Sequence, residues 1–460
     1  MLRLFDTAIG DLVEITPMTS GQFSMYVCGP TVYDVAHLGH GRYALVFDVL
    51  RRYLEWRGLK VRHVSNITDV DDKILERAEA ENCSPAEVAL EFEEKWFSTM
   101  DKLGVLKPHH IPHATEYIRQ MISLIESLIK EDAAYAGEDG IYFDTSKVSD
   151  YGLLARQSLD SLKAGARIAE KEFKRSPTDF VLWKFSEGSS WGWESPWGDG
   201  RPGWHTECVV MSVDLLGEEF DLHGGGLDLS FPHHENERAQ AAVMHYKFSR
   251  HWVHNGFVMV GSEKMSKSLS NFTTLDELLQ STDPRAYRLL VVQSHYRSPL
   301  EVNPQTVSEA SRALARLDAT RQRVGEAGVN LDEAELDRTE LAAFADAMDN
   351  DLDTPAATAR LFELRSRINQ LLDEGRLVEA ANFCATMEHL LEVLGLRLKG
   401  IWNGEITAQV QGLLDERAEA RKEKNYALSD RIRQEIFALG YAVEDTSSGQ
   451  KIRKISETPE

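Results

Sequence analysis

Apolar and polar positions near the start of the chain alternate between the spacing of buried strands and that of amphipathic helices. Residues 22–28 (QFSMYVC) form an apolar-rich run that ends at a Gly-Pro pair, which is typical of a buried strand. Apolar side chains then recur at helical spacing from Leu45 to Leu54, and Gly58 is a natural C-cap for that helix. Residues 59–67 (LKVRHVSNI) predict a second strand. This order predicts the start of a doubly wound sheet, whose ligands bind beyond the carboxyl ends of the strands.

The pattern changes twice further along the chain. Residues 74–130 predict mostly helix, and then Trp, Gly and Pro cluster from about Ala134 to Pro202, with strand-like segments at 141–143 and 180–183. We interpret this stretch as an insertion between two halves of the sheet. The α/β pattern returns at FDLHGGG, continues through a helix and the strand-like residues 256–260, and gives way to helix up to about Leu398.

We therefore predict an α/β protein with a Rossmann-type, doubly wound parallel sheet, an insertion, a helical region and a small last domain. The expected regions are the first half of the sheet domain (1–133), a connective insertion (134–202), the second half (203–260), a loop and contact region (261–315), a helical bundle (316–400) and a C-terminal domain (401–460).

Length and composition restrict the class of protein. The 460 residues suffice for roughly three domains. Lys and Arg number 51 against 74 acidic residues, a formal charge of −23, which argues against general nucleic-acid affinity but leaves room for a local basic face. The start shows no signal-peptide-like run, and no 18 consecutive residues are apolar, so we expect a cytoplasmic protein without membrane contact.

Cysteine is too sparse for a disulfide framework. The four residues are Cys28, Cys83, Cys208 and Cys384. In a long chain of this class such cysteines bind metal, act in catalysis or only pack. Cys83 and Cys384 lie in amphipathic helical surroundings, and we interpret both as packing residues.

The string His37-Leu38-Gly39-His40 lies at the opening of the first predicted helix. A helix N-terminus carries unpaired N–H groups and a partial positive charge, so phosphate binds there readily. His37 and His40 could donate to phosphate oxygens as charge develops. A pair of ordinary turn histidines is an alternative interpretation of so short a motif.

Lys264 and Lys267 lie in GSEKMSKSLSN, between a predicted strand and a predicted helix. Ammonium groups on a mobile loop suit a leaving pyrophosphate, which must be clamped and then released. An exposed Lys/Ser loop is the alternative. The HLGH string and the KMSKS string together predict an enzyme that attacks the α-phosphate of ATP and expels pyrophosphate.

A third group of residues carries sulfur. Cys28 ends the first strand, Cys208 opens an apolar helix-like run, and His233 and Glu237 share one helix face. Two thiolates, an imidazole and a carboxylate make a plausible zinc shell. Spacing leaves His205 and His234 as rival ligands, and buried cysteines beside a helix-capping cluster remain an alternative.

Gly225 and Asp228 follow a strand in HGGGLD. Glycine lets a backbone approach a planar base closely, and a carboxylate suits ribose hydroxyls. A flexible turn explains the glycines equally well.

Taken together, these strings resemble those of a known family. HLGH with KMSKS is similar to the class I aminoacyl-tRNA synthetases. The longer strings resemble the cysteinyl-tRNA synthetases in particular: MYVCGPTVYDVAHLGH, NITDVDDKI, RPGWHTEC, FDLHGGGLDLSFPHHENE, EKMSKSLSNF and AMDNDLDTP. The similarity covers essentially the whole chain. One departure is Ser270, where the family usually has Gly.

The resemblance implies one zinc ion per chain, L-cysteine and tRNA(Cys) as substrates, and Mg²⁺ with ATP. It also implies stem contacts by 261–315, anticodon binding by 401–460 and, we expect, a monomer. The implied site residues are the zinc ligands Cys28, Cys208, His233 and Glu237; the catalytic His37, His40, Lys264 and Lys267; the ATP and adenylate contacts Gly29, His37, Gly39, His40, Gly225, Asp228 and Lys267; and the cysteine contacts Cys28, Thr68 and Trp204.

Zinc would explain how such an enzyme selects its amino acid. An apolar pocket separates near-isosteres such as cysteine and serine by only about a hundredfold. A soft metal with an open position binds a thiolate far better than a hydroxyl. We therefore expect no editing domain, and the 134–202 insertion is short for one.

Two rival functions remain from sequence. A ligase that joins cysteine to an amino sugar, as in mycothiol biosynthesis, would share the core motifs. The cations Arg417, Arg421, Lys422 and Lys424 favour a tRNA anticodon, although Glu419 and Glu423 among them are also typical of a solvated helix face. The other rival is a zinc-stabilised RNA-binding protein without catalysis, against which the intact His and Lys motifs argue.

Overall fold

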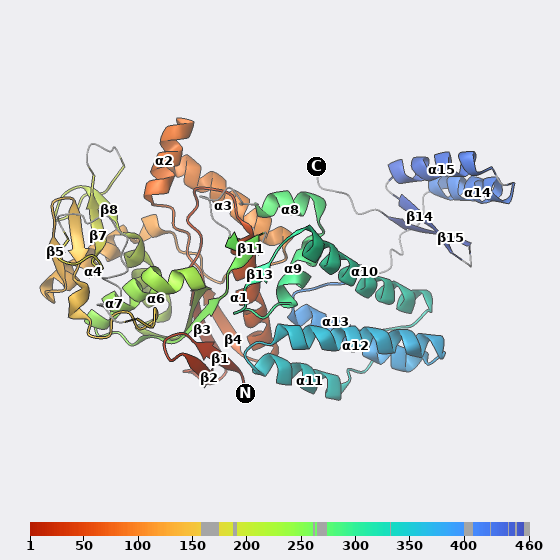
Figure 1. Cartoon of the computed structure of the whole chain (residues 1–460), viewed down its shortest axis with the longest axis horizontal. Coiled ribbons are helices and arrows are strands. Elements are labelled where there is room, and N and C mark those ends of the chain that lie inside the picture. The colour runs from red at the N-terminus through yellow and green to blue at the C-terminus, as the bar shows by residue number, and fades with distance from the viewer. Residues whose placement is uncertain are drawn as a thin grey trace. The chain divides into compact units, whose positions relative to one another are not determined.

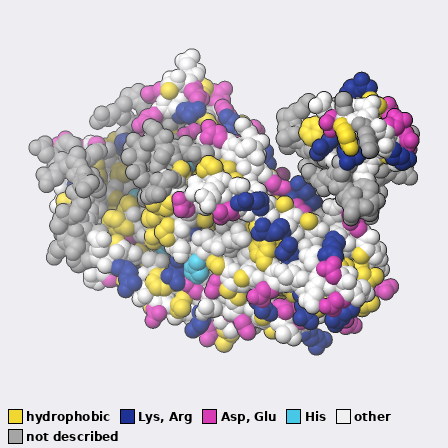
Figure 2. Space-filling view, turned by 45° about the vertical axis from the view of Figure 1, so that its right-hand side comes forward, with side chains coloured by type: hydrophobic (Ala, Val, Ile, Leu, Met, Phe, Trp, Pro, Cys, Tyr) yellow, Lys and Arg dark blue, Asp and Glu magenta, His cyan; other side chains and the backbone are white. Residues whose placement is uncertain are grey.

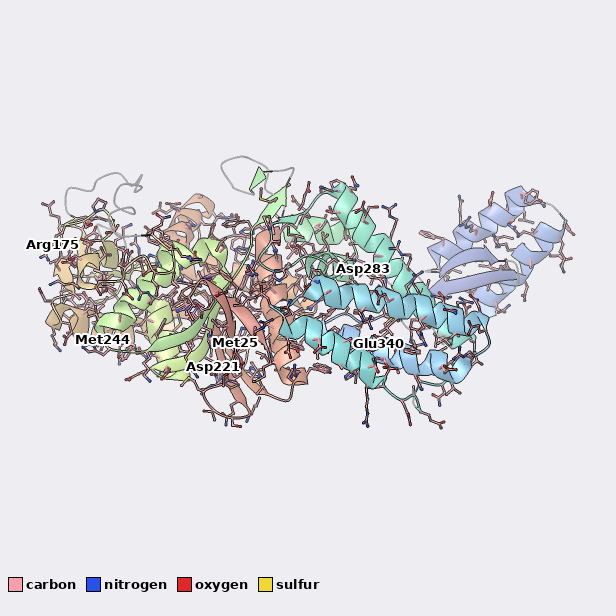
Figure 3. All side chains as sticks on the ribbon, turned by 60° about the horizontal axis from the view of Figure 1, so that its bottom comes forward. Met25, Arg175, Asp221, Met244, Asp283 and Glu340 are labelled. Atoms are coloured by element: carbon pink, nitrogen blue, oxygen red, sulfur yellow. The ribbon has the colours of Figure 1, made fainter. Side chains whose placement is uncertain are left out.

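The computed structural model is shown in Figure 1. Four parallel strands form its central sheet in the order β10–β9–β3–β4. They are β3 (Gln22–Val27), β4 (Lys60–Val64), β9 (Glu219–Gly226) and β10 (Phe248–Asn255). Met25 on β3 is fully buried at the middle of the sheet (Figure 3). The predicted Rossmann-type sheet, assembled from two distant parts of the chain, is confirmed. The structure describes residues 1–157, 174–186, 191–260, 263–264, 274–331, 333–399, 408–423, 425–439, 441–446 and 449–454.

Helix α1 (Leu38–Trp56) connects β3 to β4, as the apolar spacing predicted. It ends where Gly58 adopts a φ of 85°, a left-handed conformation that glycine accepts without strain. Helices α2 (Asp72–Glu81), α3 (Pro85–Lys102) and α4 (Ile118–Lys130) follow, the last preceded by the 3₁₀ turn η1 (Ala114–Tyr117). The connection before η1 is not helical, because its carbonyls pair with the β4 edge, for example His110 O with Ser65 N at 3.1 Å.

The insertion forms an antiparallel sheet of four strands in the order β5–β6–β7–β8. The strands are β5 (Ala134–Ala136), β6 (Gly140–Phe143), β7 (Phe180–Phe185) and β8 (Gly200–Pro202), with the 3₁₀ turn η2 (Thr145–Lys147) after β6. Trp183 is fully buried and belongs to the same apolar core as Tyr26 of β3 and Leu128 of α4. The insertion therefore packs continuously with the central sheet.

The second half of the sheet domain carries the segments that later form the site. Helix α6 (Trp204–Leu216) leads into β9, which is followed by the 3₁₀ turn η3 (Leu227–Leu229), the π-helical turn η4 (Ser230–His234) and α7 (Glu235–Val243). A hairpin of β1 (Arg3–Asp6) and β2 (Asp11–Glu14) lies against β10 through the Thr7 N to Trp252 O hydrogen bond of 2.8 Å.

Helices dominate after the sheet. β11 (Val258–Val260) pairs with β12 (Glu263–Lys264) and β13 (Leu300–Glu301), and the helices are α8 (Leu275–Ser281), α9 (Pro284–Val292), α10 (Pro304–Glu326), α11 (Arg338–Asp349), α12 (Thr354–Asp373) and α13 (Leu377–Val393). Arg288 of α9 ties this region to the sheet domain, because its buried guanidinium pairs with Asp48 of α1 at 2.6 Å and donates to the Leu103 and Leu394 carbonyls. No helix in the described ranges is long and apolar enough to cross a membrane.

The chain divides into two compact units, one of residues 1–320 and 329–398 and one of residues 321–328 and 399–460. The second contains α14 (Ala408–Lys422), α15 (Tyr426–Ala438), β14 (Tyr441–Thr446) and β15 (Gly449–Lys454) around a small apolar core. Arg417, which the sequence suggested as part of a surface cation cluster, is instead fully buried and donates to Gln450 at 2.7 Å. Of the other members, Lys422 pairs with Glu419, and Lys424 lies outside the described residues.

Charged side chains of both signs are mixed over the visible face of the molecule (Figure 2). The net charge of −23 is thus not concentrated there as one acidic surface. The overall charge therefore says little about where an anionic partner would bind.

His63 on β4 should make stability depend on pH. Burial lowers its pKa to about 3, with Arg51 and His109 adding to the effect against the opposing Asp48. The unfolded chain takes up this proton near pH 6.5, so the contribution of neutral His63 is complete above that pH and is lost as the pH falls toward 3. At pH 5.5 the loss is about 1.4 kcal/mol.

The check is urea unfolding at pH 7.5 and 5.5 of the wild type and of His63→Phe. Acidification should lower the free energy of unfolding of both proteins, and the decrease should be about 1.4 kcal/mol smaller in the variant than in the wild type. Other buried histidines titrate in both proteins and cancel in the difference. Equal losses in the two proteins would contradict the prediction.

Candidate active site and metal centre

A cavity of about 440 Å³ lies beyond the carboxyl ends of β3 and β9, where a doubly wound sheet binds its ligands. Seven of the site residues that the resemblance implied line it. Those that line it are Cys28, Gly29, His37, Gly39, His40, Trp204 and Asp228. Tyr33, Lys73, Gly226 and Asn255 also line it.

The HLGH string forms a reciprocal cap at the start of α1. His37 is the N-cap, and its Nδ1 accepts from His40 N at 3.2 Å, while His40 Nδ1 accepts from His37 N at 3.4 Å. The two rings stack with their centroids 3.6 Å apart. Because each Nδ1 accepts a backbone N–H, Nε2 carries the proton of each neutral ring. Two N–H donors therefore stand at the positive end of a 19-residue helix.

The described chain after the KMSKS segment meets this helix end again at Thr274 and Leu275. Leu275 N donates to Ala36 O at 2.8 Å, and Thr274 forms a β-bridge with His37. Lys264 belongs to β12, whereas Lys267 lies outside the described residues. Thr274 is seven residues beyond Lys267, and both Lys264 and Thr274 belong to the first unit.

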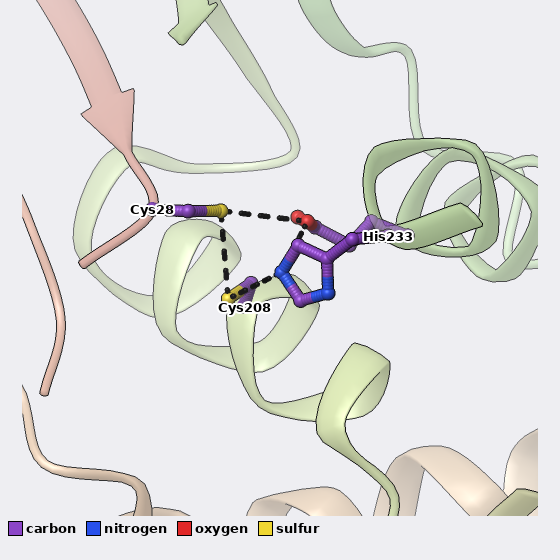
Figure 4. Close-up of side chains that lie close together, drawn as sticks. Cys28, Cys208 and His233 are labelled. Atoms are coloured by element: carbon purple, nitrogen blue, oxygen red, sulfur yellow. Dashed lines mark hydrogen bonds and ion pairs between the residues drawn. The ribbon is translucent and has the colours of Figure 1, made fainter. Parts of the chain in front are cut away.

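Four buried side chains converge on one point (Figure 4). They come from the end of β3 and from α6, η4 and α7. Cys28 Sγ lies 3.8 Å from Cys208 Sγ and 3.5 Å from Glu237 Oε1. His233 Nε2 lies 3.6 Å from Cys208 Sγ and 3.1 Å from Glu237 Oε1. All four ligand atoms lie within 4.8 Å of one another. The structure therefore joins residues that are up to 209 positions apart in sequence.

These spacings fit a tetrahedral zinc site. From Zn–S bonds of about 2.3 Å and Zn–N or Zn–O bonds of about 2.0–2.1 Å, a tetrahedron sets two sulfurs about 3.8 Å apart, sulfur and nitrogen or oxygen about 3.6 Å apart, and nitrogen and oxygen about 3.4 Å apart. The observed separations agree with these edges to within a few tenths of an ångström. Two thiolates with one imidazole also select zinc over hard cations.

Burial disfavours charge on the sulfur and imidazole side chains of this cluster. It raises the pKa of Cys208 to about 12 and raises the pKa of Cys28 well above its ordinary value. It also lowers the pKa of His233 well below its ordinary value. Buried thiols and a neutral imidazole beside a carboxylate are a donor set whose ionisation a bound cation would drive.

Histidines around the cluster hold its members in place. His223 Nε2 bonds Glu237 Oε2 at 2.8 Å, and His205 Nδ1 lies 2.9 Å from His233 Nδ1, on the side of that ring away from Cys208. His234 turns the other way and bonds His254 at 2.8 Å. A second possible ligand set of Cys28, His223, His234 and Glu237 shares two members with the first but contains only one sulfur.

The remaining predicted residues take varied positions. A Cβ on Gly29 would lie 1.6 Å from the Asn66 carbonyl oxygen, so this turn requires glycine. Trp204 stacks on His233 at 4.1 Å. Gly225 packs against His234, and its neighbour Gly226 lines the cavity instead. Thr68 is buried, is hydrogen-bonded to Glu207 and is not among the lining residues.

Comparison with known proteins identifies the family. Residues 14–312 match the catalytic domain of class I (C) tRNA synthetases, residues 343–399 the DALR domain and residues 403–453 the anticodon binding domain of cysteinyl-tRNA ligases. The cysteine–tRNA ligase of Thermococcus onnurineus is 42% identical over 99% of this chain and 99% of its own. The chain belongs to the cysteinyl-tRNA synthetase family. The Halorhodospira halophila member is also 42% identical, over 99% of this chain and 100% of its own.

Solved structures show the same class I fold at low identity. Mycobacterium tuberculosis methionyl-tRNA synthetase, in complex with methionyl-adenylate, has a TM-score of 0.60 at 14% identity and covers 81% of this chain and 89% of its own. An Agrobacterium radiobacter LeuRS in a ternary complex with tRNA has a TM-score of 0.60 at 12% identity, with coverages of 83% and 86%. These likenesses show that this chain has the class I fold that the sequence predicted.

Some residues of the site were not predicted from sequence. Tyr33 and Lys73 line the cavity, and His223 contacts a predicted ligand. For His223 the sequence signal was its place in FDLHGGG, and the structure sets it opposite Tyr26 of β3. For Lys73 the only signal was its place within NITDVDDKI.

Proposed function

We propose that this chain activates L-cysteine with ATP as a cysteinyl adenylate and transfers the cysteinyl group to tRNA(Cys), releasing pyrophosphate and then AMP. One observation carries the proposal: Cys28 belongs both to the four-ligand cluster and to the wall of the cavity that contains His37 and His40. A site for a thiol and a site for a triphosphate are therefore contiguous.

In the first step the cysteine carboxylate attacks the α-phosphorus and the bond to pyrophosphate breaks. The Nε2–H groups of His37 and His40, at the N-terminus of α1, donate to the phosphate oxygens as charge builds on them. Lys264 and Lys267 neutralise the departing pyrophosphate, with Mg²⁺ accompanying ATP. The bridge between Thr274 and His37 places the described chain that follows these lysines at the same helix end.

Amino-acid selection is assigned to the other side of the cavity. Cys28, Cys208, His233 and Glu237 would hold zinc, which supplies a soft cation that prefers the sulfur of cysteine to the hydroxyl of serine. Trp204 stacks on His233 and covers this end, and Asp228 offers a carboxylate to the ribose of the adenylate.

In the second step the terminal ribose 2′-hydroxyl of tRNA attacks the adenylate carbonyl and AMP leaves. The match of residues 403–453 to an anticodon binding domain supports tRNA as the acceptor rather than an amino sugar. The separate second unit, with its own core, supports the assignment of residues 401–460 to anticodon binding. We extend the proposal to stem contacts by 261–315.

The test is a cysteine-dependent ATP–pyrophosphate exchange assay with serine in parallel, followed by charging of tRNA(Cys) and of the amino-sugar acceptor. We expect exchange with cysteine, serine rejected by well over about 100-fold, and charging of tRNA alone. Charging of the amino sugar, or steeply salt-dependent tRNA binding without ATP consumption, would contradict the proposal.

A further inference from the structure

Lys73 is an exposed cation on the wall of the candidate active-site cavity. It lines the same hollow as His40 and Trp204, and its Nζ lies 5.0 Å from the centroid of the Tyr33 ring. Among the described residues it makes no ion pair. A lysine that is exposed and yet lines the cavity stands at its mouth.

The two carboxylates that precede Lys73 form their hydrogen bonds with groups other than its ammonium. Asp71 is the N-cap of α2, and its Oδ1 accepts from the backbone N of Lys73 at 2.9 Å. Asp72 pairs with Lys184 Nζ of β7 at 2.5 Å and accepts from Arg201 Nε of β8 at 2.9 Å. These bonds fix the first turn of α2 against the insertion. The backbone at Lys73 is thereby anchored, and among the described residues neither carboxylate forms an ion pair with its ammonium.

The position of Lys73 favours a ligand that arrives from solvent. The α-phosphate of ATP belongs at the His37–His40 end of α1, and an exposed ammonium is too well screened to contribute much to a group enclosed there. The transfer step, in contrast, requires the terminal ribose hydroxyl of an RNA strand inside the cavity. The phosphodiester on the 5′ side of that nucleotide is separated from the hydroxyl by one ribose. It would therefore lie near the mouth of the cavity.

We propose that Lys73 binds a backbone phosphate at the single-stranded 3′ end of the acceptor tRNA and so positions the terminal ribose for transfer. The inference rests on the proposed function, because it requires an RNA acceptor. Lys73 acts as a positioning residue: it takes no proton and forms no bond in the reaction. The Tyr33 ring face holds its ammonium in place through a cation–π contact.

The experiment compares Lys73→Met and Lys73→Arg with Lys60→Met. Lys60 is also an exposed lysine; it begins β4, at the amino end of the sheet and away from the cavity. Its substitution by Met changes the net charge by the same amount. Two readouts are taken on the full chain: cysteine-dependent exchange without tRNA, and kcat/KM for tRNA(Cys) as a function of NaCl concentration.

Lys73→Met should leave exchange within about twofold of wild type and lower kcat/KM for tRNA about 10-fold at low salt. It should also make the log–log salt dependence shallower by about 0.7, the value of one phosphate contact on a single strand. Lys73→Arg should restore most of the loss, and Lys60→Met should behave as wild type.

Three results would overturn the inference: an exchange defect as large as the charging defect, which places Lys73 in activation; an unchanged salt slope; or an equal effect of Lys60→Met. A wild-type chain that shows no cysteine-dependent exchange would instead overturn the proposed function. The two failures are therefore distinguishable.

Discussion

Cys208→Ser is expected to remove zinc from the protein and, with it, the preference for cysteine. Cys208 Sγ lies 3.8 Å and 3.6 Å from Cys28 Sγ and His233 Nε2, and it is 1% exposed. Replacement of one of the two soft thiolates should weaken zinc binding by more than about 100-fold. Changes in residues that only hydrogen-bond to the metal ligands typically cost about 10–100-fold. The measurements are zinc per chain by elemental analysis and cysteine-dependent exchange.

Cys83→Ser is the matched control, because Cys83 lies outside the cluster and is exposed, so the expectation that it packs was wrong. It should retain one zinc ion per chain and full exchange. The Cys208 variant also separates the two possible ligand sets, since Cys208 belongs only to the first. Full zinc occupancy in Cys208→Ser would rule out the first set as the metal centre.

His40→Ala is expected to lower the rate of cysteine-dependent exchange by about 10²–10³-fold, the usual cost of removing one donor that stabilises transition-state charge. His40 Nδ1 also accepts from His37 N at 3.4 Å, so the variant loses one half of the α1 cap. The cost in stability should be only about 1 kcal/mol. Exchange rates over a range of ATP concentrations and urea unfolding measure the two effects.

Ser84→Ala provides the matched control for the lost cap. Ser84 and Glu87 form the same reciprocal cap at α3, on exposed residues that do not line the cavity. This variant should lose a similar amount of stability and keep full exchange. Exchange in His40→Ala within a few-fold of that in Ser84→Ala would show that His40 serves only the helix.

Much of the sheet domain was predictable because local patterns there coincide with burial. The run at 22–28 and the helical spacing from Leu45 to Leu54 correspond to β3 and to the buried face of α1. The family resemblance, carried by strings over the whole chain, is confirmed by full-length relatives. Both kinds of signal depend on residues close together in sequence.

The metal cluster could not be derived from spacing alone. His233 and His234 are adjacent, and only the π-helical turn of η4 directs the first toward Cys208 and the second toward His254. Such a turn leaves no periodic signal in the sequence. His205 lies one helical turn from Cys208, yet it bonds the far nitrogen of His233.

The buried arginines were also beyond sequence reasoning. Arg417 alternates with acidic residues as a surface cation would, but its guanidinium is enclosed in the second unit and bonded to Gln450. Arg288 is likewise buried, with three hydrogen-bonding partners from distant segments. A long cation can be buried where distant groups satisfy its donors, and a local pattern does not contain those partners.

The central claim is that a zinc ion held by Cys28, Cys208, His233 and Glu237 distinguishes the thiol of cysteine from the hydroxyl of serine. The most direct test measures exchange with both amino acids on protein as purified, after chelation to a metal-free state proven by elemental analysis, and after addition of one equivalent of zinc. We predict that cysteine-dependent exchange disappears with the metal and returns with zinc, together with the rejection of serine. Metal-free protein that still activates cysteine and rejects serine would contradict the account.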